Sequence, residues 1–106
     1  MNYFEFIKMH GLGNDFVIID NRQNLVKIKK KETLKKIGSR NFGIGCDQIL
    51  IIEGYDNKNA EVTIFNNDGS EVGACGNGVR CVASYLMNKQ NTTEIKIKTI
   101  SGKLDC

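Results

Sequence analysis

An apolar helix over residues 78–86 is the feature that most constrains the fold of this chain. Its apolar positions recur at the three- and four-residue spacing of an α-helix: Val79, Val82, Ala83 and Leu86. Cys81 and Tyr85 widen the apolar surface beyond the single stripe of a helix that faces solvent on its other sides. Because such a helix is poorly suited to water on most of its surface, we expect it to be embedded among other elements.

The segments around this helix have the pattern of strands. We expect strands over residues 3–10, 16–20, 48–53, 60–66 and 94–100, followed by a turn at residues 101–103 and the start of a returning strand. Glycines within residues 10–15 predict a tight connection between the first two strands. The polar residues 54–59 predict a hairpin between the third and fourth strands.

Six lysines within residues 27–36 account for much of the net charge of +3. Leu34 and Ile37 lie three residues apart among them, which predicts a short amphipathic helix that ends near Gly38 or Gly43. A lysine cluster can form a nucleic-acid footprint, but no aromatic or arginine residue is interleaved with this one. We interpret it as a solvated helix face with its loop, and we expect no nucleic-acid partner.

A Cys-Gly-Asn-Gly turn at residues 75–78 opens the apolar helix. A helix N-terminus carries N–H groups without intrahelical partners and a partial positive charge, which together hold anions such as a carboxylate. Gly76 and Gly78 let the backbone turn tightly and leave no side chain between these N–H groups and a ligand. The same field lowers the pKa of Cys75 and favours its thiolate. The turn therefore predicts an acid/base group that acts beside a bound carboxylate.

Three other interpretations compete for this turn. Its glycines resemble a dinucleotide-binding loop, but no strand–turn–helix fingerprint with a downstream acidic residue accompanies them. Cys75 is alternatively a buried structural thiol. As a third alternative it is a nucleophile, which needs a general base close by, and His10 is the only histidine in the chain.

Length and composition limit the class of protein. The chain has 106 residues, of which 41% are hydrophobic and 25% charged, as is typical of one globular domain with its own core. No apolar run has the length of a membrane span, and residues 1–5 lack the opening of a secretory signal. We expect a cytoplasmic protein with no membrane partner. The four cysteines form no C-x-x-C pair and His10 is the only histidine, so no structural zinc site is expected. A disulfide framework is not expected in a cytoplasmic chain with a core of its own.

Three blocks of this sequence resemble the N-terminal signature blocks of the diaminopimelate epimerases. The blocks read KMHGLGNDFVIID at residues 8–20, RNFGIGCDQILII at residues 40–52 and FNNDGSEVGACGNGVRC at residues 65–81. They occur in this order, and the C-G-N-G block is highly specific in company with H-G-L-G-N-D-F. Spacing alone names no substrate, whereas the resemblance implies one. The family is similar in mechanism to proline racemase and other cofactor-independent amino-acid racemases.

The resemblance implies an epimerase that interconverts LL- and meso-diaminopimelate, in lysine synthesis, without pyridoxal phosphate, another cofactor or a metal. One cysteine thiolate removes the α-proton from one face of the amino acid, and a second cysteine thiol protonates the opposite face. Helix N-termini that hold the carboxylate stabilise the developing negative charge. Water exclusion by domain closure strengthens this effect.

The family motifs also imply a role for individual residues. These are a catalytic acid/base for Cys75, a backbone cradle for the substrate carboxylate at Gly76 and Asn77, and substrate contacts for Asn14, Gln48 and Asn66. Without the resemblance, the last three are ordinary turn and strand-edge residues. His10 and Asp15 either tune the thiol or brace their loop.

Two features depart from the family pattern. Cys46 stands where the family usually has an aromatic residue, and its strand-like surroundings predict a substitution in the core. The second signature block, with its own cysteine, is absent. Family members are about twice this length and consist of two similar domains, so residues 1–106 are expected to be the N-terminal domain and to need the C-terminal domain as a partner.

The implied fold is α+β, with a curved, mostly antiparallel sheet wrapped around one central helix that begins near Gly76. The chain alone is expected to be inactive, since Cys46, Cys81 and Cys106 are poorly placed to act as the second acid/base. A homodimer that joins two copies of Cys75 is the alternative. Two other functions stay open: a proline or hydroxyproline racemase-like enzyme, and a non-catalytic carboxylate-binding or redox-sensing module.

Overall fold

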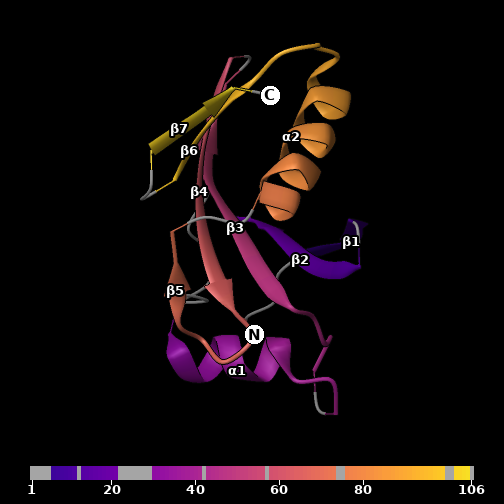
Figure 1. Cartoon of the computed structure of the whole chain (residues 1–106), viewed down its shortest axis with the longest axis vertical. Helices are drawn as coiled ribbons and strands as arrows, with labels where there is room; N and C mark the ends of the chain where they lie inside the picture. The colour runs from indigo at the N-terminus through magenta and orange to yellow at the C-terminus, as the bar shows by residue number, and fades with distance from the viewer. Residues whose placement is uncertain are drawn as a thin grey trace.

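The computed structural model describes residues 6–11, 13–21, 30–41, 43–56, 58–73, 76–99 and 102–105. The elements follow in chain order: β1 (Phe6–Gly11), β2 (Asn14–Asp20), α1 (Lys31–Gly38), β3 (Gln48–Tyr55), β4 (Asn59–Asn66), β5 (Glu71–Val72), α2 (Gly76–Gln90), β6 (Lys96–Thr99) and β7 (Gly102–Asp105). Within these ranges the strands form one sheet in the order β1-β2-β3-β4-β6-β7, and β5 also pairs with β4 (Figure 1). The predicted α+β class is confirmed.

Strand directions explain where the two helices lie. The pairs β1–β2, β3–β4, β4–β5 and β6–β7 are antiparallel, whereas β2–β3 and β4–β6 are parallel. Parallel neighbours need a crossover connection, and α1 lies in the first crossover and α2 in the second. Because the two parallel pairs run in opposite directions, the right-handed crossover rule predicts the two helices on opposite faces of the sheet. The two core clusters bear this out.

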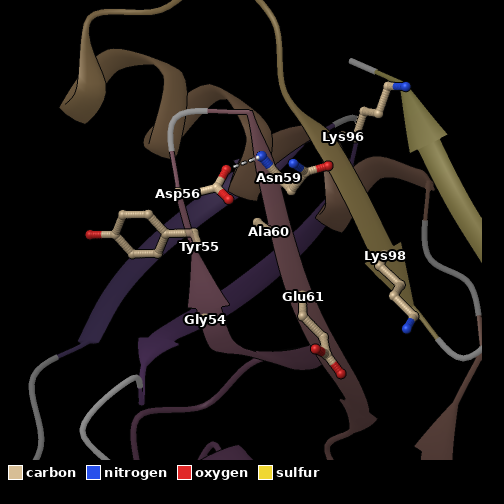
Figure 2. Close-up of a pocket in the computed structure, with 8 residues that line it drawn as sticks. All are labelled: Gly54, Tyr55, Asp56, Asn59, Ala60, Glu61, Lys96 and Lys98. Atoms are coloured by element: carbon tan, nitrogen blue, oxygen red, sulfur yellow. Dashed lines mark hydrogen bonds between the residues drawn. The ribbon is translucent and has the colours of Figure 1, made fainter.

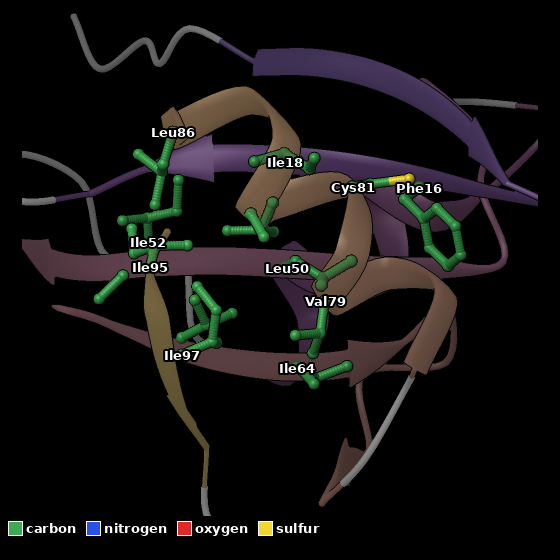
Figure 3. Packing of buried hydrophobic residues seen from close by; sticks show 14 residues of the cluster. Phe16, Ile18, Leu50, Ile52, Ile64, Val79, Cys81, Leu86, Ile95 and Ile97 are labelled. Carbon is green, nitrogen blue, oxygen red and sulfur yellow. The ribbon is translucent and has the colours of Figure 1, made fainter. Parts of the chain in front are cut away.

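The sheet separates those two apolar clusters. On one face, alternate residues of β2, β3 and β4 pack against α2, and this larger cluster includes Phe16, Ile18, Leu50, Ile52, Ile64, Val79 and Leu86 (Figure 3). On the other face, the intervening residues pack against α1, in a cluster that includes Val17, Ile19, Leu34, Ile37, Ile49, Ile51 and Phe65. Strands buried on both faces read as continuous apolar runs, as residues 16–19 and 49–52 do. α2 contacts β1, β2, β3 and β6, but Arg80, Ser84 and Asn88 form an exposed stripe along it, so the helix is less embedded than predicted.

The hairpin at the start of the sheet is tighter than the sequence suggested. β1 continues to Gly11 and β2 begins at Asn14, so only two residues connect them, and Gly13 adopts a φ of 91°. That left-handed conformation favours glycine. Of the strand predicted over residues 3–10, the first three residues lie outside the described ranges.

The predicted hairpin of β3 and β4 is confirmed, but both strands extend further into the expected turn. Pairing continues past a register shift between Ile52 and Gly54, up to the Tyr55–Ala60 pair. A hollow of about 560 Å³ lies at this end of the sheet and is lined by Gly54, Tyr55, Asp56, Asn59, Ala60, Glu61, Lys96 and Lys98 (Figure 2). Here β4 and β6 present the polar side chains of Asn59, Glu61, Lys96 and Lys98. The cluster under α1 contains none of these residues and takes only Phe65 from β4.

The remaining elements differ from the predictions mainly at their ends. α1 ends at Gly38, with its described lysines exposed, so the solvated helix face is confirmed for this part of the lysine cluster. β6 is shorter than the strand predicted over residues 94–100, although the alternation of buried Ile95 and Ile97 with exposed lysines is as expected. The strand β5, which has only two residues, was not predicted from the sequence. Among the described residues, no helix is both long enough and apolar enough to cross a membrane.

Candidate functional site

Asn14, Gln48 and Asn66 lie together at one end of the sheet, on the face that α2 covers. Gln48 begins β3 and pairs in register with Asn66, the last residue of β4. Gln48 also pairs with Phe16 of β2, and Asn14 lies two residues before Phe16 in the same strand. Since alternate residues of a strand point to one face, all three amides share the face of Phe16, Leu50 and Ile64. The sheet therefore gathers three residues that are up to 52 positions apart in the chain.

Two of these amides are in direct contact. Gln48 Nε2 donates to Asn66 Oδ1 over 3.2 Å, and Asn66 Nδ2 donates to the Ser70 hydroxyl over 3.3 Å. The backbone N–H of Asn66 donates to the carbonyl of Ser70 over 2.8 Å, which closes the turn after β4. Both side chains are half-buried, and the contact orients two amide groups, each of which can both donate and accept hydrogen bonds.

The first turn of α2 reaches the same end of the sheet. A Cβ atom placed on Gly11 would lie 3.5 Å from Cys81 Sγ, 3.6 Å from the Phe16 ring and 3.7 Å from Asn77 Cβ. Gly11 pairs in register with Asn14, so Asn77 is brought close to the β1–β2 hairpin that carries Asn14. Figure 3 shows the direction of the helix, with Cys81 beside Phe16 and Leu86 further along beside Ile52 and Ile95.

The N-terminus of α2, with its partial positive charge, therefore lies at the end of the sheet that carries the three amides. α2 begins at Gly76, and no acidic residue lies in its first turn. Nothing in that turn compensates the helix dipole, as a negatively charged side chain would. Cys75 directly precedes this turn but lies outside the described residues, as does Ala74. Its predicted role stays a prediction.

On the opposite face, next to these amides, a charged cluster surrounds Asp15. Arg40 donates from Nη1 to Asp15 Oδ2 over 3.0 Å and from Nη2 to Oδ1 over 2.8 Å. Lys8 Nζ lies 3.1 Å from Asp15 Oδ2. These contacts, with Arg40 contributing most, hold the pKa of the buried Asp15 carboxyl well below its ordinary value, although burial acts the other way. The Asp15 carboxylate in turn raises the pKa of Arg40.

The open question about His10 and Asp15 is answered in part by these contacts. Asp15 braces the hairpin, because its described partners are Lys8, Arg40 and Asp47. His10 is exposed, and its backbone carbonyl lies 3.9 Å from Cys81 Sγ, within reach of a weak S–H hydrogen bond. Whether either residue tunes Cys75 stays a prediction, since the thiol lies outside the described ranges.

Cys46 is buried as predicted. It has no solvent exposure and belongs to the cluster under α1, on the face of the sheet opposite α2. Burial raises the pKa of its thiol to about 11, and the negative charge of Asp15 acts in the same direction. Cys46 is therefore a neutral core residue at neutral pH and is separated by the sheet from the three amides.

The hollow in Figure 2 is separate from this site. It lies at the other end of β3 and β4 from Gln48 and Asn66, and none of the predicted site residues lines it. Over the residues that the structure describes, no three His, Cys, Asp or Glu side chains come together in a group that could hold a metal ion.

Comparison with known protein families agrees with these features. A sequence model of the family described as diaminopimelate epimerase matches residues 6–106. The chain belongs to the diaminopimelate epimerase family. Proteins named diaminopimelate epimerase from Teredinibacter turnerae, Acinetobacter baylyi and Carboxydothermus hydrogenoformans are 50%, 48% and 43% identical to it, over 92–93% of this chain.

This chain is much shorter than those relatives and spans only 36–37% of their length. The expectation that family members are about twice as long was therefore too low. Solved structures share the fold: a PhzC/PhzF phenazine biosynthesis protein from Clostridium difficile has a TM-score of 0.64 at 22% identity, over 88% of this chain and 33% of that one. A PhzF-family protein from Bacillus anthracis has a TM-score of 0.63 at 16% identity, over 96% and 33%.

The residues that hold the site together were not predicted from the sequence. Lys8, Arg40 and Asp47 were not singled out, although all three lie within the family-like blocks. The available signal was the position of Asp47, which directly precedes Gln48 as Asp15 directly follows Asn14. Such sequence neighbours can fix the backbone of a site residue through their own hydrogen bonds, as Asp15 and Asp47 do.

Proposed function

We propose that this chain supplies one half of the active site of a cofactor-independent epimerase that interconverts LL- and meso-diaminopimelate in lysine biosynthesis, in the cytoplasm. Membership of the diaminopimelate epimerase family supports the substrate. The observation that carries the proposal is the convergence of Asn14, Gln48 and Asn66 with the first turn of α2. Such a site suits an amino acid, which presents a carboxylate and an ammonium group together.

In this proposal the first turn of α2 binds the substrate carboxylate through Gly76 and Asn77. The positive end of the helix dipole favours the anion and stabilises the further negative charge that develops when the α-proton leaves. The side-chain amides both donate and accept hydrogen bonds, so Asn14, Gln48 and Asn66 can serve the ammonium and carboxylate groups of the substrate. Neutral amides also leave the positive field of the helix uncompensated.

Cys75 is the acid/base on one face of the substrate. Its thiolate takes the α-proton as the C–H bond breaks, and the electron pair stays on the α-carbon, delocalised into the carboxylate. A second cysteine thiol then donates its proton to the opposite face of that carbon. We propose that the second cysteine belongs to a second domain of the protein, and the greater length of the relatives supports this.

Deuterium incorporation at the α-carbon of diaminopimelate in D₂O tests this function in the full-length protein. The unsubstituted protein is expected to exchange diaminopimelate and not proline. Cys75→Ser is expected to lose exchange while it still binds the substrate, and Cys46→Ala is the matched control because Cys46 lies on the opposite face of the sheet. Full activity of Cys75→Ser would reject its catalytic role, and preferential exchange of proline would favour a proline racemase-like enzyme.

A further inference from the structure

The three amides have sequence neighbours that meet at the same end of the sheet. Asp15 follows Asn14, Asp47 precedes Gln48, and Asn67 follows Asn66. The described β2–β3 register begins at the pair of Phe16 and Gln48, so Asn14 lies beyond it. What fixes Asn14 relative to β3 must therefore come from contacts other than the regular ladder.

Asp15 and Asp47 supply these contacts through a reciprocal set of hydrogen bonds. The backbone N–H of Asp47 donates to Asp15 Oδ1 over 2.9 Å and to the Asp15 carbonyl over 3.0 Å. The backbone N–H of Asp15 donates to Asp47 Oδ2 over 3.0 Å. Each aspartate thus holds the backbone of the other, and the pair joins the β1–β2 hairpin to the start of β3.

Arg40 allows two carboxylates to share this small space. Its Nη2 atom donates to Asp15 Oδ1 over 2.8 Å and to Asp47 Oδ1 over 3.2 Å, so one guanidinium bridges both. Without that positive charge, the two carboxylates would repel each other and disfavour the reciprocal arrangement. Arg40 lies between α1 and β3, and the bridge therefore also fixes that connection.

Asp47 contacts the neighbourhoods of all three amides. Asn14 Nδ2 lies 3.4 Å from Asp47 Oδ2, within weak hydrogen-bond distance, and the backbone N–H of Asn67 donates to the Asp47 carbonyl over 3.2 Å. Gln48 is the next residue in the chain. Asp47 thus links the hairpin that carries Asn14 with the turn that follows Asn66.

We infer that Asp47, bridged to Asp15 by Arg40, is the positioning residue that aligns Asn14, Gln48 and Asn66 for substrate binding. This inference rests on the proposed function. Asp47 does not touch the substrate; it acts through the backbone and side-chain positions of the three amides. The effect of Asp47 therefore falls on substrate binding, because the amides contact the substrate in the ground state as well as in the transition state.

Asp47→Asn in the full-length protein is the direct test. An amide keeps one oxygen acceptor but turns an NH₂ donor toward either Arg40 or the Asp15 N–H, so one hydrogen bond to a charged group is lost. We expect kcat/KM for diaminopimelate to fall about 10- to 100-fold, mainly through a higher KM. Arg40→Lys keeps the charge but not the bidentate geometry, and we expect an intermediate loss.

Asp56→Asn is the matched control. Asp56 also accepts hydrogen bonds from backbone N–H groups, those of Lys58 and Asn59, but it lies at the other end of β3. We expect its KM to stay unchanged. A purely structural role of Asp47 would lower the active fraction, and hence kcat, without changing KM. Equal KM values for Asp47→Asn, Asp56→Asn and the unsubstituted protein would overturn the inference.

A second measurement separates this inference from the proposed function. If the unsubstituted protein does not exchange diaminopimelate, the proposed function fails, and the side-chain amide NMR signals of Asn14, Gln48 and Asn66 then test the positioning alone. We expect these signals to shift in Asp47→Asn and to stay in place in Asp56→Asn. Unshifted signals in a folded Asp47→Asn protein would reject the positioning role.

Discussion

At the scale of single residues, the two faces of the sheet give similar side chains different roles. Cys46 and Cys81 are both buried, but Cys46 packs under α1, whereas Cys81 packs under α2 beside Gly11. Asn59 is the first residue of β4 and Asn66 is the last, and of these two only Asn66 contacts Gln48 on the α2 face. The chemistry open to each residue therefore depends on its face and its end of the sheet.

The raised pKa of Cys46 predicts a specific loss of stability at alkaline pH. The folded state keeps this thiol protonated up to about pH 11, whereas an unfolded chain releases the proton from about pH 8.5. The stabilisation is therefore complete below about pH 8.5 and is lost as the pH rises through the folded pKa. Denaturant unfolding measures the free energy of unfolding at pH 7 and at pH 10. This free energy should decrease less between the two pH values in Cys46→Ala than in the unsubstituted chain. Equal decreases would contradict the buried, neutral thiol.

Asn66→Ala in the full-length protein is expected to weaken diaminopimelate processing by roughly 1–3 kcal/mol, since buried polar partners lose a hydrogen bond. The turn should survive, because the backbone N–H of Asn66 and its carbonyl make the hydrogen bonds to Ser70 and Gly69. Steady-state kinetics measure the effect, with Asn59→Ala at the other end of β4 as the control. Kinetics that match the control would return Asn66 to the role of a turn residue.

At the scale of elements, close approaches fix how helices meet the sheet. α1 ends at Gly38, and a Cβ atom there would lie 2.7 Å from the carbonyl oxygen and 2.8 Å from the Cα of Asn67. The end of α1 thus rests on the turn that follows β4. α2 makes a looser approach to β1 at Gly11, where the corresponding distances are those of ordinary van der Waals contact.

Gly38→Ala is expected to lower the free energy of unfolding by about 1–3 kcal/mol, because backbone atoms of Asn67 must move. The control is Gly54→Ala in β3, since a Cβ there meets nothing within 4 Å. We expect that control to leave stability unchanged or to raise it by up to about 1 kcal/mol. Chemical denaturation of both variants measures the difference. Equal stabilities would show that the contact between α1 and Asn67 is looser than the structure has it.

At the scale of the whole molecule, the described residues place neither Cys46 nor Cys81 as a second acid/base. Inversion needs an acid and a base on opposite faces of one carbon, each within hydrogen-bond reach of the transferred proton. Cys46 lies on the opposite face of the sheet, and Cys81 lies within α2, about 7.5 Å along the helix axis from its first residue, Gly76. We propose that the opposing thiol comes from another domain.

The 106-residue chain alone is therefore expected to incorporate no deuterium at the α-carbon of diaminopimelate in D₂O. Circular dichroism should first establish that the isolated chain is folded, and the full-length protein assayed in parallel should exchange. Mass spectrometry of the recovered amino acid measures the incorporation. Robust exchange by the folded chain alone would reject the two-domain site and favour a homodimer that brings two copies of Cys75 together.

The sequence by itself determined the local elements and the family of this protein. Alternation and helical spacing depend on residues close together in the chain, so they predicted β3, β4, α2 and the burial of Cys46. Three motif blocks identified the diaminopimelate epimerase family, and with it a list of candidate site residues. The short strand β5 escaped this reasoning because two residues carry no periodic pattern.

Only the tertiary structure decided how these parts meet. Parallel pairing of β2 with β3 and antiparallel pairing of β3 with β4 bring Asn14, Gln48 and Asn66 to one end of one face. The bridge of Arg40 between Asp15 and Asp47 joins residues up to 32 positions apart. Strand order and such long-range contacts depend on the packing of the whole sheet against both helices, and the local sequence pattern carries no record of that packing.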